Sequence, residues 1–172
     1  AFAALLGALA LKAGRPTLPR TARRMLLAGA LLLCLGPVLR TAERLSDHIR
    51  LEVLDVGQSQ ALLLRLPGHV RMLLDGSGSA STRFDPGRAI VAPALTYNDS
   101  PQLAAVLNTH PDLDHMGGLL HVLRFFAVDQ LFENGREGKA SWGDQWRAAR
   151  EAHHSRPLAR GDVLVLGDVA NG

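Results

Sequence analysis

Residues 109–118, with the sequence THPDLDHMGG, constrain the fold of this 172-residue chain more than any other segment. They follow the apolar run Leu103–Asn108, which is typical of a buried strand. Gly117 and Gly118 allow the backbone to turn closely and enter a following helix. Two histidines and two aspartates thus stand at the carboxyl end of a strand, where α/β folds place their sites. The segment predicts a layered α/β fold.

Four side chains of this segment are candidate metal ligands: His110, Asp112, Asp114 and His115. Carboxylate oxygen together with imidazole nitrogen suits zinc, manganese or iron. Structural zinc sites are usually closed by four Cys and His ligands, so a carboxylate-rich set indicates an open catalytic centre. The single cysteine, Cys34, excludes a disulfide within the chain and a zinc site built from cysteines. The alternative is a solvated acidic turn that contains two histidines by chance.

The apolar residues concentrate in the first 45 positions. Met25–Leu39 is an uninterrupted apolar run of 15 residues, and we expect it to span a membrane with flanking residues that bring it towards the roughly 20 positions required. A signal peptide has a similar basic start, but no clean cleavage site of small residues follows. The upstream run Ala1–Ala10 is typical of the end of another helix. Residues 1–45 therefore predict a membrane hairpin.

The loop between the two apolar runs is strongly basic. Its cations are Lys12, Arg15, Arg20, Arg23 and Arg24. Loops of this kind tend to stay in the cytoplasm, so the chain from about Ser46 onwards is expected on the periplasmic or extracellular side. The alternative is a nucleic-acid-binding patch. The net charge of +3 by itself suits a polyanion or anionic lipid only weakly.

Residues 46–172 read as one domain with strands first and helices later. The expected strands are Ile49–Val56, Ala61–Leu66, Val70–Leu74, Leu103–Asn108, Val128–Phe132 and Asp162–Leu166, and the expected helices are Gly118–Phe126 and Ser141–His154. The first three strands predict an antiparallel run across short Gly- and Pro-marked breaks. Trp142 and Trp146 lie four residues apart, so we expect them on one helix face that packs against the sheet.

The segment His110-x-Asp112-x-Asp114-His115 resembles the H-x-[HD]-x-D-H signature of the metallo-β-lactamase superfamily. Together with the blocks LDVGQ at residues 54–58 and LLDG at residues 73–76, it resembles the ComEC family of competence DNA channels. That family joins a hydrolase domain to the end of a polytopic membrane region. The resemblance implies that residues 46–172 form the N-terminal half of a metallo-β-lactamase-like αββα sandwich, preceded by transmembrane helices.

The resemblance also implies roles for individual residues. His110 and Asp112 would bind one divalent metal ion, and Asp114 and His115 would bind a second, with Asp114 also acting as the catalytic residue that orients a bridging water. The two metals are expected to be zinc or manganese. Asp112 stands where other members have histidine, and its oxygen shifts the preference away from zinc towards harder ions such as manganese. The remaining histidine and bridging aspartate of the family's site were not found in the sequence.

Two further aspartates, Asp55 and Asp75, stand at predicted strand ends close to glycines. We expect them to orient the ligand histidines, although capping of a turn is an equally good interpretation. The chain departs from the family at Ser59-Gln60, where the family often has Gly-Asp.

Three functions remain open on this basis. The resemblance implies a metal-dependent nuclease in the inner cell membrane that degrades one DNA strand during transformation, with DNA, the membrane and other competence proteins as partners. A membrane-tethered hydrolase of a small molecule is the second, because this fold carries several chemistries. A non-enzymatic DNA-binding platform is the third, and the intact cluster of ligands argues against it.

Overall fold

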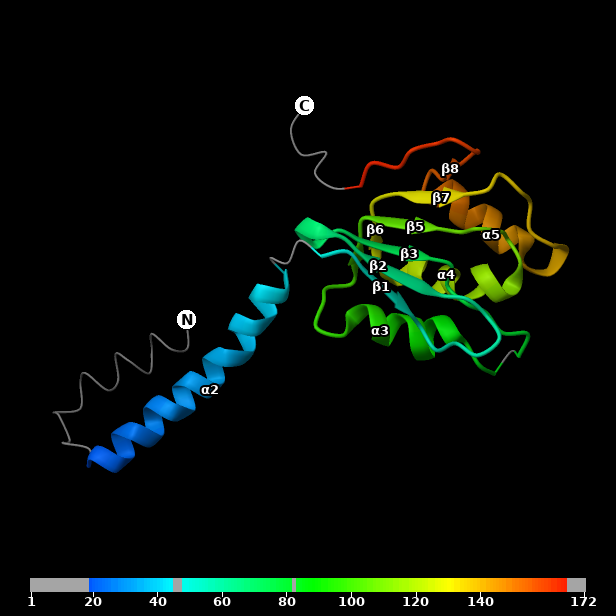
Figure 1. Cartoon of the computed structure of the whole chain (residues 1–172). Coiled ribbons are helices and arrows are strands. Elements are labelled where there is room, and N and C mark those ends of the chain that lie inside the picture. Colours follow the sequence, from blue (N-terminus) through cyan, green and yellow to red (C-terminus); the bar gives the residue numbers. More distant parts are fainter. Residues whose placement is uncertain (1–18, 45–47, 82, 167–172) are drawn as a thin grey trace. The chain divides into compact units, whose positions relative to one another are not determined.

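The computed structural model describes residues 19–44, 48–81 and 83–166. The chain divides into two compact units, residues 1–44 and residues 45–172, which are described separately (Figure 1). The predicted helix at Ala1–Ala10 lies outside the described residues. The assignment of residues 1–45 and 46–172 to two functional domains stays a prediction.

The first unit contains one described helix, α2 (Arg20–Arg44), of 25 residues. It includes the whole predicted apolar run, and its segment Arg20–Leu39 has a mean hydropathy of 1.6 with no buried residues. Leu33 of this helix is 80% exposed. A helix rises about 1.5 Å per residue, so α2 is long and apolar enough to cross a bilayer core of about 30 Å.

The second unit is built on a six-stranded sheet in the order β1-β2-β3-β5-β7-β8. Its strands are β1 (Arg50–Val53), β2 (Leu62–Arg65), β3 (Arg71–Leu74), β5 (Ala105–Leu107), β7 (Leu131–Glu133) and β8 (Arg156–Pro157). The first three pair antiparallel, as the sequence predicts, and the remaining pairs are parallel. A second, two-stranded parallel sheet joins β4 (Gln102–Leu103) to β6 (Ala127–Val128).

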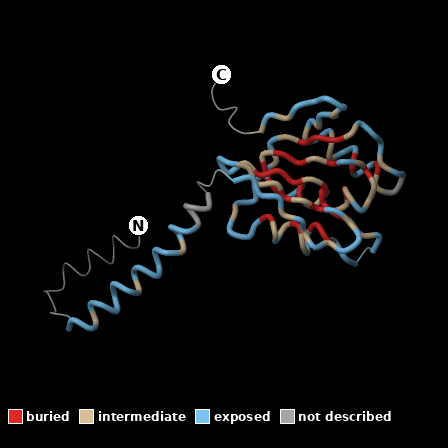
Figure 2. The backbone as a smooth tube through the Cα atoms, viewed as in Figure 1, coloured by how far each residue is buried: buried red, intermediate tan, exposed pale blue. Residues whose placement is uncertain are grey.

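Helices cover one face of the main sheet (Figure 1). They are the π-helix η2 (Gly87–Val91), α3 (Ala92–Thr96), α4 (Leu113–Phe125) and α5 (Ala140–Ala152), and a short 3-10 helix, η1 (Pro67–His69), joins β2 to β3. The core lies between sheet and helices, where Figure 2 shows the buried backbone. Leu73 and Val106 of the sheet are fully buried there, as is Leu119 of α4. This arrangement confirms the predicted α/β class.

Trp146 of α5 is 1% exposed in this core, and Trp142 packs against it while partly buried. The prediction of one core-facing tryptophan pair on this helix is confirmed.

The opposite face of the sheet carries a smaller apolar cluster around Met72 and Phe132. Leu164 and Leu166 pack against this cluster, whereas Val163 and Val165 are each 77% exposed. The alternation is strand-like, but this segment pairs with no strand among the described residues, so the predicted strand Asp162–Leu166 is wrong. The sheet is extended instead by β8, immediately after α5.

Helix α4 begins at Leu113, five residues before the predicted start at Gly118. Asp112 is its N-cap residue, with extended backbone angles. The two glycines that suggested a turn lie inside the helix because α4 approaches η2 and residues 76–78, which follow β3, so closely that neither position has space for a side chain. Two of the candidate ligands, Asp114 and His115, therefore lie in the first helical turn and not in a loop.

Candidate metal centre

The centre lies where two parallel strands end side by side. Strands β3 and β5 pair in register, with Leu74 opposite Leu107, so the residues that follow them meet at one edge of the sheet. The backbone N–H of Asp75 donates to the carbonyl oxygen of Leu107 at 2.8 Å and continues this pairing by one residue. The segment that carries the candidate ligands starts from the same edge, directly after Asn108.

Asp75 is fully buried and organises this edge. Its Oδ1 accepts the backbone N–H of Thr109 at 2.8 Å, and its Oδ2 accepts the Thr109 hydroxyl at 2.7 Å. Oδ2 also lies 2.8 Å from Nδ1 of His115. A buried carboxylate must be paired to be tolerated, and these contacts provide the pairing.

The contact with Asp75 assigns the tautomer of His115. A carboxylate accepts hydrogen bonds, so Nδ1 of His115 carries the proton and Nε2 keeps its lone pair. Ligand histidines commonly donate their second nitrogen to a carboxylate in this way. Nε2 of His115 lies 3.5 Å from Oδ2 of Asp114, whose side chain is 55% exposed. Two ligands at about 2.1 Å from a tetrahedral metal are about 3.4 Å apart, so this pair matches one ion.

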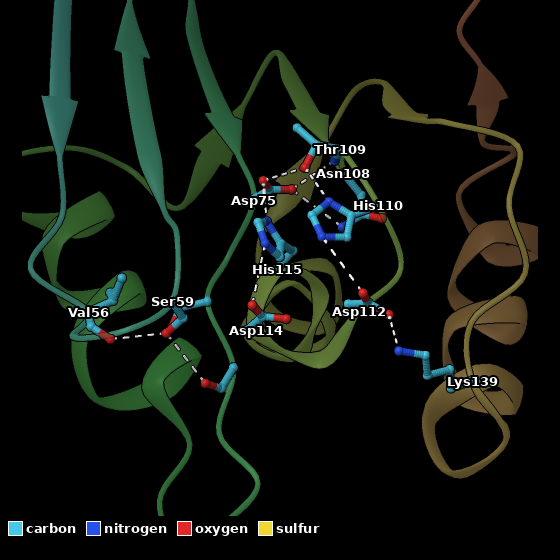
Figure 3. A network of polar contacts seen from close by, with 12 residues as sticks. Val56, Ser59, Asp75, Asn108, Thr109, His110, Asp112, Asp114, His115 and Lys139 are labelled. Carbon is cyan, nitrogen blue, oxygen red and sulfur yellow. Dashed lines mark hydrogen bonds and ion pairs between the residues drawn. The ribbon is translucent and has the colours of Figure 1, made fainter.

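The second pair of candidate ligands lies beside the first. Nε2 of His110 is 3.9 Å from Oδ2 of Asp112, and the ring centroids of His110 and His115 are 3.7 Å apart. Nδ1 of His110 lies 3.1 Å from the hydroxyl of Thr109. Figure 3 shows all four predicted ligands gathered next to Asp75 and Thr109. The structure thus brings the predicted ligands together.

The backbone of two other segments holds the first turn of α4 in place. The N–H of Gly76 donates to the carbonyl of His115, and the N–H of Gly118 donates to that of Ser77, each at 2.7 Å. A Cβ on Gly118 would overlap the carbonyl oxygen of Gly76, so only glycine permits this approach. The N–H of Gln60 donates to the carbonyl of Asp114 at 3.3 Å. The second and third sequence blocks of the resemblance therefore meet at one place with the residues that follow the first block.

Ser59, at one of the positions that depart from the family, takes part in this packing. Its hydroxyl lies 2.7 Å from that of Ser77 and donates to the carbonyl of Val56 at 3.0 Å (Figure 3). The departure is accommodated by a hydroxyl pair between the residues that directly follow the first and second blocks.

The family model of the metallo-β-lactamase superfamily matches residues 54–170, which include every strand of the sheet after β1, the helices that cover it and all four candidate ligands. The chain belongs to the metallo-β-lactamase superfamily. This membership supports a hydrolase in general, and the metallo-β-lactamase fold implies divalent metal ions, usually zinc.

The chain is also similar to "ComE operon protein 3" of Bacillus subtilis (strain 168), with 28% identity over 138 residues. The match covers 73% of this chain and 18% of the relative, so the chain corresponds to a small part of that protein's length. This similarity supports the resemblance to the ComEC family.

The donor set fits the divalent ions that the metallo-β-lactamase fold implies. It offers two imidazole nitrogens and two carboxylates, and the ring of His115 is oriented by the buried Asp75. Among the described residues, no group of three or more His, Cys, Asp or Glu side chains converges on one point. The ligands instead lie in pairs, so each ion would need further ligands from elsewhere in the protein or from water.

Two predicted residues behave differently here. Asp75 contacts a candidate ligand histidine, as expected of a residue that orients it. Asp55 is exposed, and no hydrogen bond or ion pair joins it to another described residue. Its part in the centre stays a prediction.

No pattern in the sequence predicts two other neighbours of the ligands. Asn134 donates from Nδ2 to the carbonyl of Thr109 at 2.7 Å, and Nζ of Lys139 lies 3.2 Å from Oδ1 of Asp112. Both belong to the segment between β7 and α5, 19 or more positions beyond the ligands. Contacts between residues this far apart in the sequence depend on the fold and leave no local sequence pattern.

Proposed function

We propose that this chain is part of a membrane-anchored, metal-dependent nuclease of a ComEC-like DNA-uptake protein, which degrades one strand of incoming DNA. The observation that carries the proposal is the His115 ring, which a buried Asp75 holds so that its free nitrogen faces Asp114. Such preorganisation is typical of a catalytic metal ligand. The similarity to ComE operon protein 3 supports the uptake role.

We assign the metal ligands in two pairs, His110 with Asp112 and Asp114 with His115, for two zinc or manganese ions. Bound there, the ions would supply an acidified water and would neutralise charge that develops on the phosphodiester. Asp75 holds the proton on Nδ1 of His115 and keeps Nε2 available. Asp114 is the proposed catalytic residue, because its exposed carboxylate can accept the proton of the attacking water.

The membrane part of the proposal rests on α2. The apolar segment Arg20–Leu39 suits a single crossing, and the arginines at its start favour a cytoplasmic N-terminal end. The hydrolase unit is then on the periplasmic or extracellular side of the inner membrane, where it would meet DNA and other competence proteins.

The test is strand-resolved cleavage of duplex DNA by the protein as encoded by its gene. The two strands carry different end labels, and zinc, manganese or a chelator is added to wild type and to Asp114→Ala. We expect loss of one strand only in the presence of metal, and little or no loss in Asp114→Ala. Asp129→Ala is the matched control and should cleave normally, because it changes an exposed carboxylate that forms no hydrogen bond or ion pair with the described residues. Strand loss in chelator, or undiminished cleavage by Asp114→Ala, would refute the proposal.

A further inference from the structure

The segment Asn134–Lys139, between β7 and α5, forms one wall of the metal centre. Asn134 anchors its start through the hydrogen bond from Nδ2 to the carbonyl of Thr109 at 2.7 Å. Near its end, a Cβ on Gly138 would lie 3.5 Å from the carbonyl oxygen of Pro111. The segment therefore lies next to the ligand-bearing residues near both of its ends.

This wall is held from behind by a buried ion pair. Glu133, 1% exposed, accepts the N–H of Gly135 on Oε2 at 2.6 Å and pairs through Oε1 with Arg150 of α5 at 3.0 Å. Arg150 also contacts Glu137 at 3.3 Å. The segment is thus tied to a strand and a helix as well as to the ligand loop, and it presents its side chains in a defined place.

Lys139 points from this wall to the ligands. Its Nζ lies 3.2 Å from Oδ1 of Asp112, as Figure 3 shows, and its side chain is 87% exposed. An ion pair this exposed stabilises the fold little, so the Lys139 side chain is not needed for the stability of the fold. The ammonium group has three donors, and Asp112 uses only part of that capacity.

We propose that Lys139 binds a phosphate of the DNA next to the cleavage point, and that it exchanges Asp112 for this phosphate when Asp112 takes up a metal ion. This inference rests on the proposed nuclease function. When Asp112 binds a divalent ion, its carboxylate attracts the ammonium group of Lys139 less strongly. A phosphate of the bound DNA is then the anion that Lys139 can bind. Lys139 is accordingly a positioning residue for a polyanion, and it takes no proton from the reacting atoms.

The experiment measures equilibrium binding of a labelled duplex to the protein as encoded by its gene, over a range of salt concentrations. It uses an Asp114→Asn background, which is expected to prevent cleavage. His110 and Asp112 are unchanged in this background and can still bind the metal ion that competes with Lys139 for Asp112. Each phosphate contact adds close to one unit to the slope of log affinity against log salt. With manganese present, we expect Lys139→Gln to reduce this slope by about one unit, and Lys139→Arg to keep it.

Two comparisons make the test specific. Arg88→Gln removes an exposed cation of η2 whose side chain forms no hydrogen bond or ion pair with the described residues of the metal centre, and it should leave the slope unchanged. In chelator, Asp112 still occupies Lys139, so the effect of Lys139→Gln should shrink. An unchanged slope in Lys139→Gln, or an equal loss with and without metal, overturns this inference while the nuclease proposal stands. If neither wild type nor Asp114→Asn binds DNA, both fall together.

Discussion

Nδ1 of His115 lies 2.8 Å from the carboxylate of Asp75, a residue 40 positions earlier in the chain. One residue comes from the end of a strand and the other from the first turn of a helix. This pairing determines which nitrogen of the imidazole faces Asp114, and several expectations follow from it and from the packing around it.

Replacement of Asp75 by Asn should weaken metal binding while the fold is kept. Asn tolerates the left-handed backbone at this position, where φ is +56°, but its amide cannot fix the His115 tautomer as a carboxylate does. Loss of such a partner typically lowers metal affinity about 10–100-fold. Competition with a chelator of known affinity measures the change. Asp129→Asn is the control, and an Asp75→Asn protein with wild-type metal affinity would contradict this role.

Gly118→Ala should disrupt the contact between α4 and the segment after β3. The added methyl group would overlap the carbonyl oxygen of Gly76, so the helix must move away from the segment that follows β3. Overpacking of this kind costs about 1–3 kcal/mol. Hydrogen exchange at the N–H of Gly118, which donates to Ser77 at 2.7 Å, reports the loss locally. Unchanged protection of this N–H would show that α4 and the segment after β3 leave space for a methyl group at residue 118.

Arg150→Met should open the region around β7, because it leaves the buried carboxylate of Glu133 without its cation. Removal of one partner of a buried pair costs about 3–5 kcal/mol. Arg147→Met on the same helix is the matched control, because its partners Asp144 and Glu137 are 87% and 64% exposed and such pairs contribute less than about 1 kcal/mol. Hydrogen exchange in β7 compares the two variants. Equal effects would mean that the Glu133 pair is energetically no different from a surface contact.

Leu33→Arg should impair membrane insertion of α2. Leu33 lies near the middle of the apolar run Met25–Leu39. An arginine near the centre of a membrane helix costs about 2.5–3.5 kcal/mol. The extractability of the protein from membranes by alkaline carbonate measures the effect. A wild-type protein that is fully released by carbonate would exclude the crossing itself.

The ligand segment was predictable because its signal is local: an apolar run, a cluster of ligand side chains and a recognisable spacing lie within consecutive residues. The antiparallel start of the sheet was predictable for the same reason. The start of α4 was not, because Gly117 and Gly118 look like a turn in sequence, and only the proximity of η2 and residues 76–78 explains them inside a helix. The segment Asp162–Leu166 alternates like a strand, but pairing depends on a partner that the sequence pattern does not encode.

The most direct measurement of the central claim is the metal content of the protein by elemental analysis after loading with zinc or manganese and removal of excess ion. The account predicts two equivalents in wild type and in Asp129→Ala, and the loss of about one equivalent in each of His110→Ala and His115→Ala. Variants that retain the wild-type metal content, or a folded wild-type protein that retains none, would contradict the assignment of these residues as a metal centre.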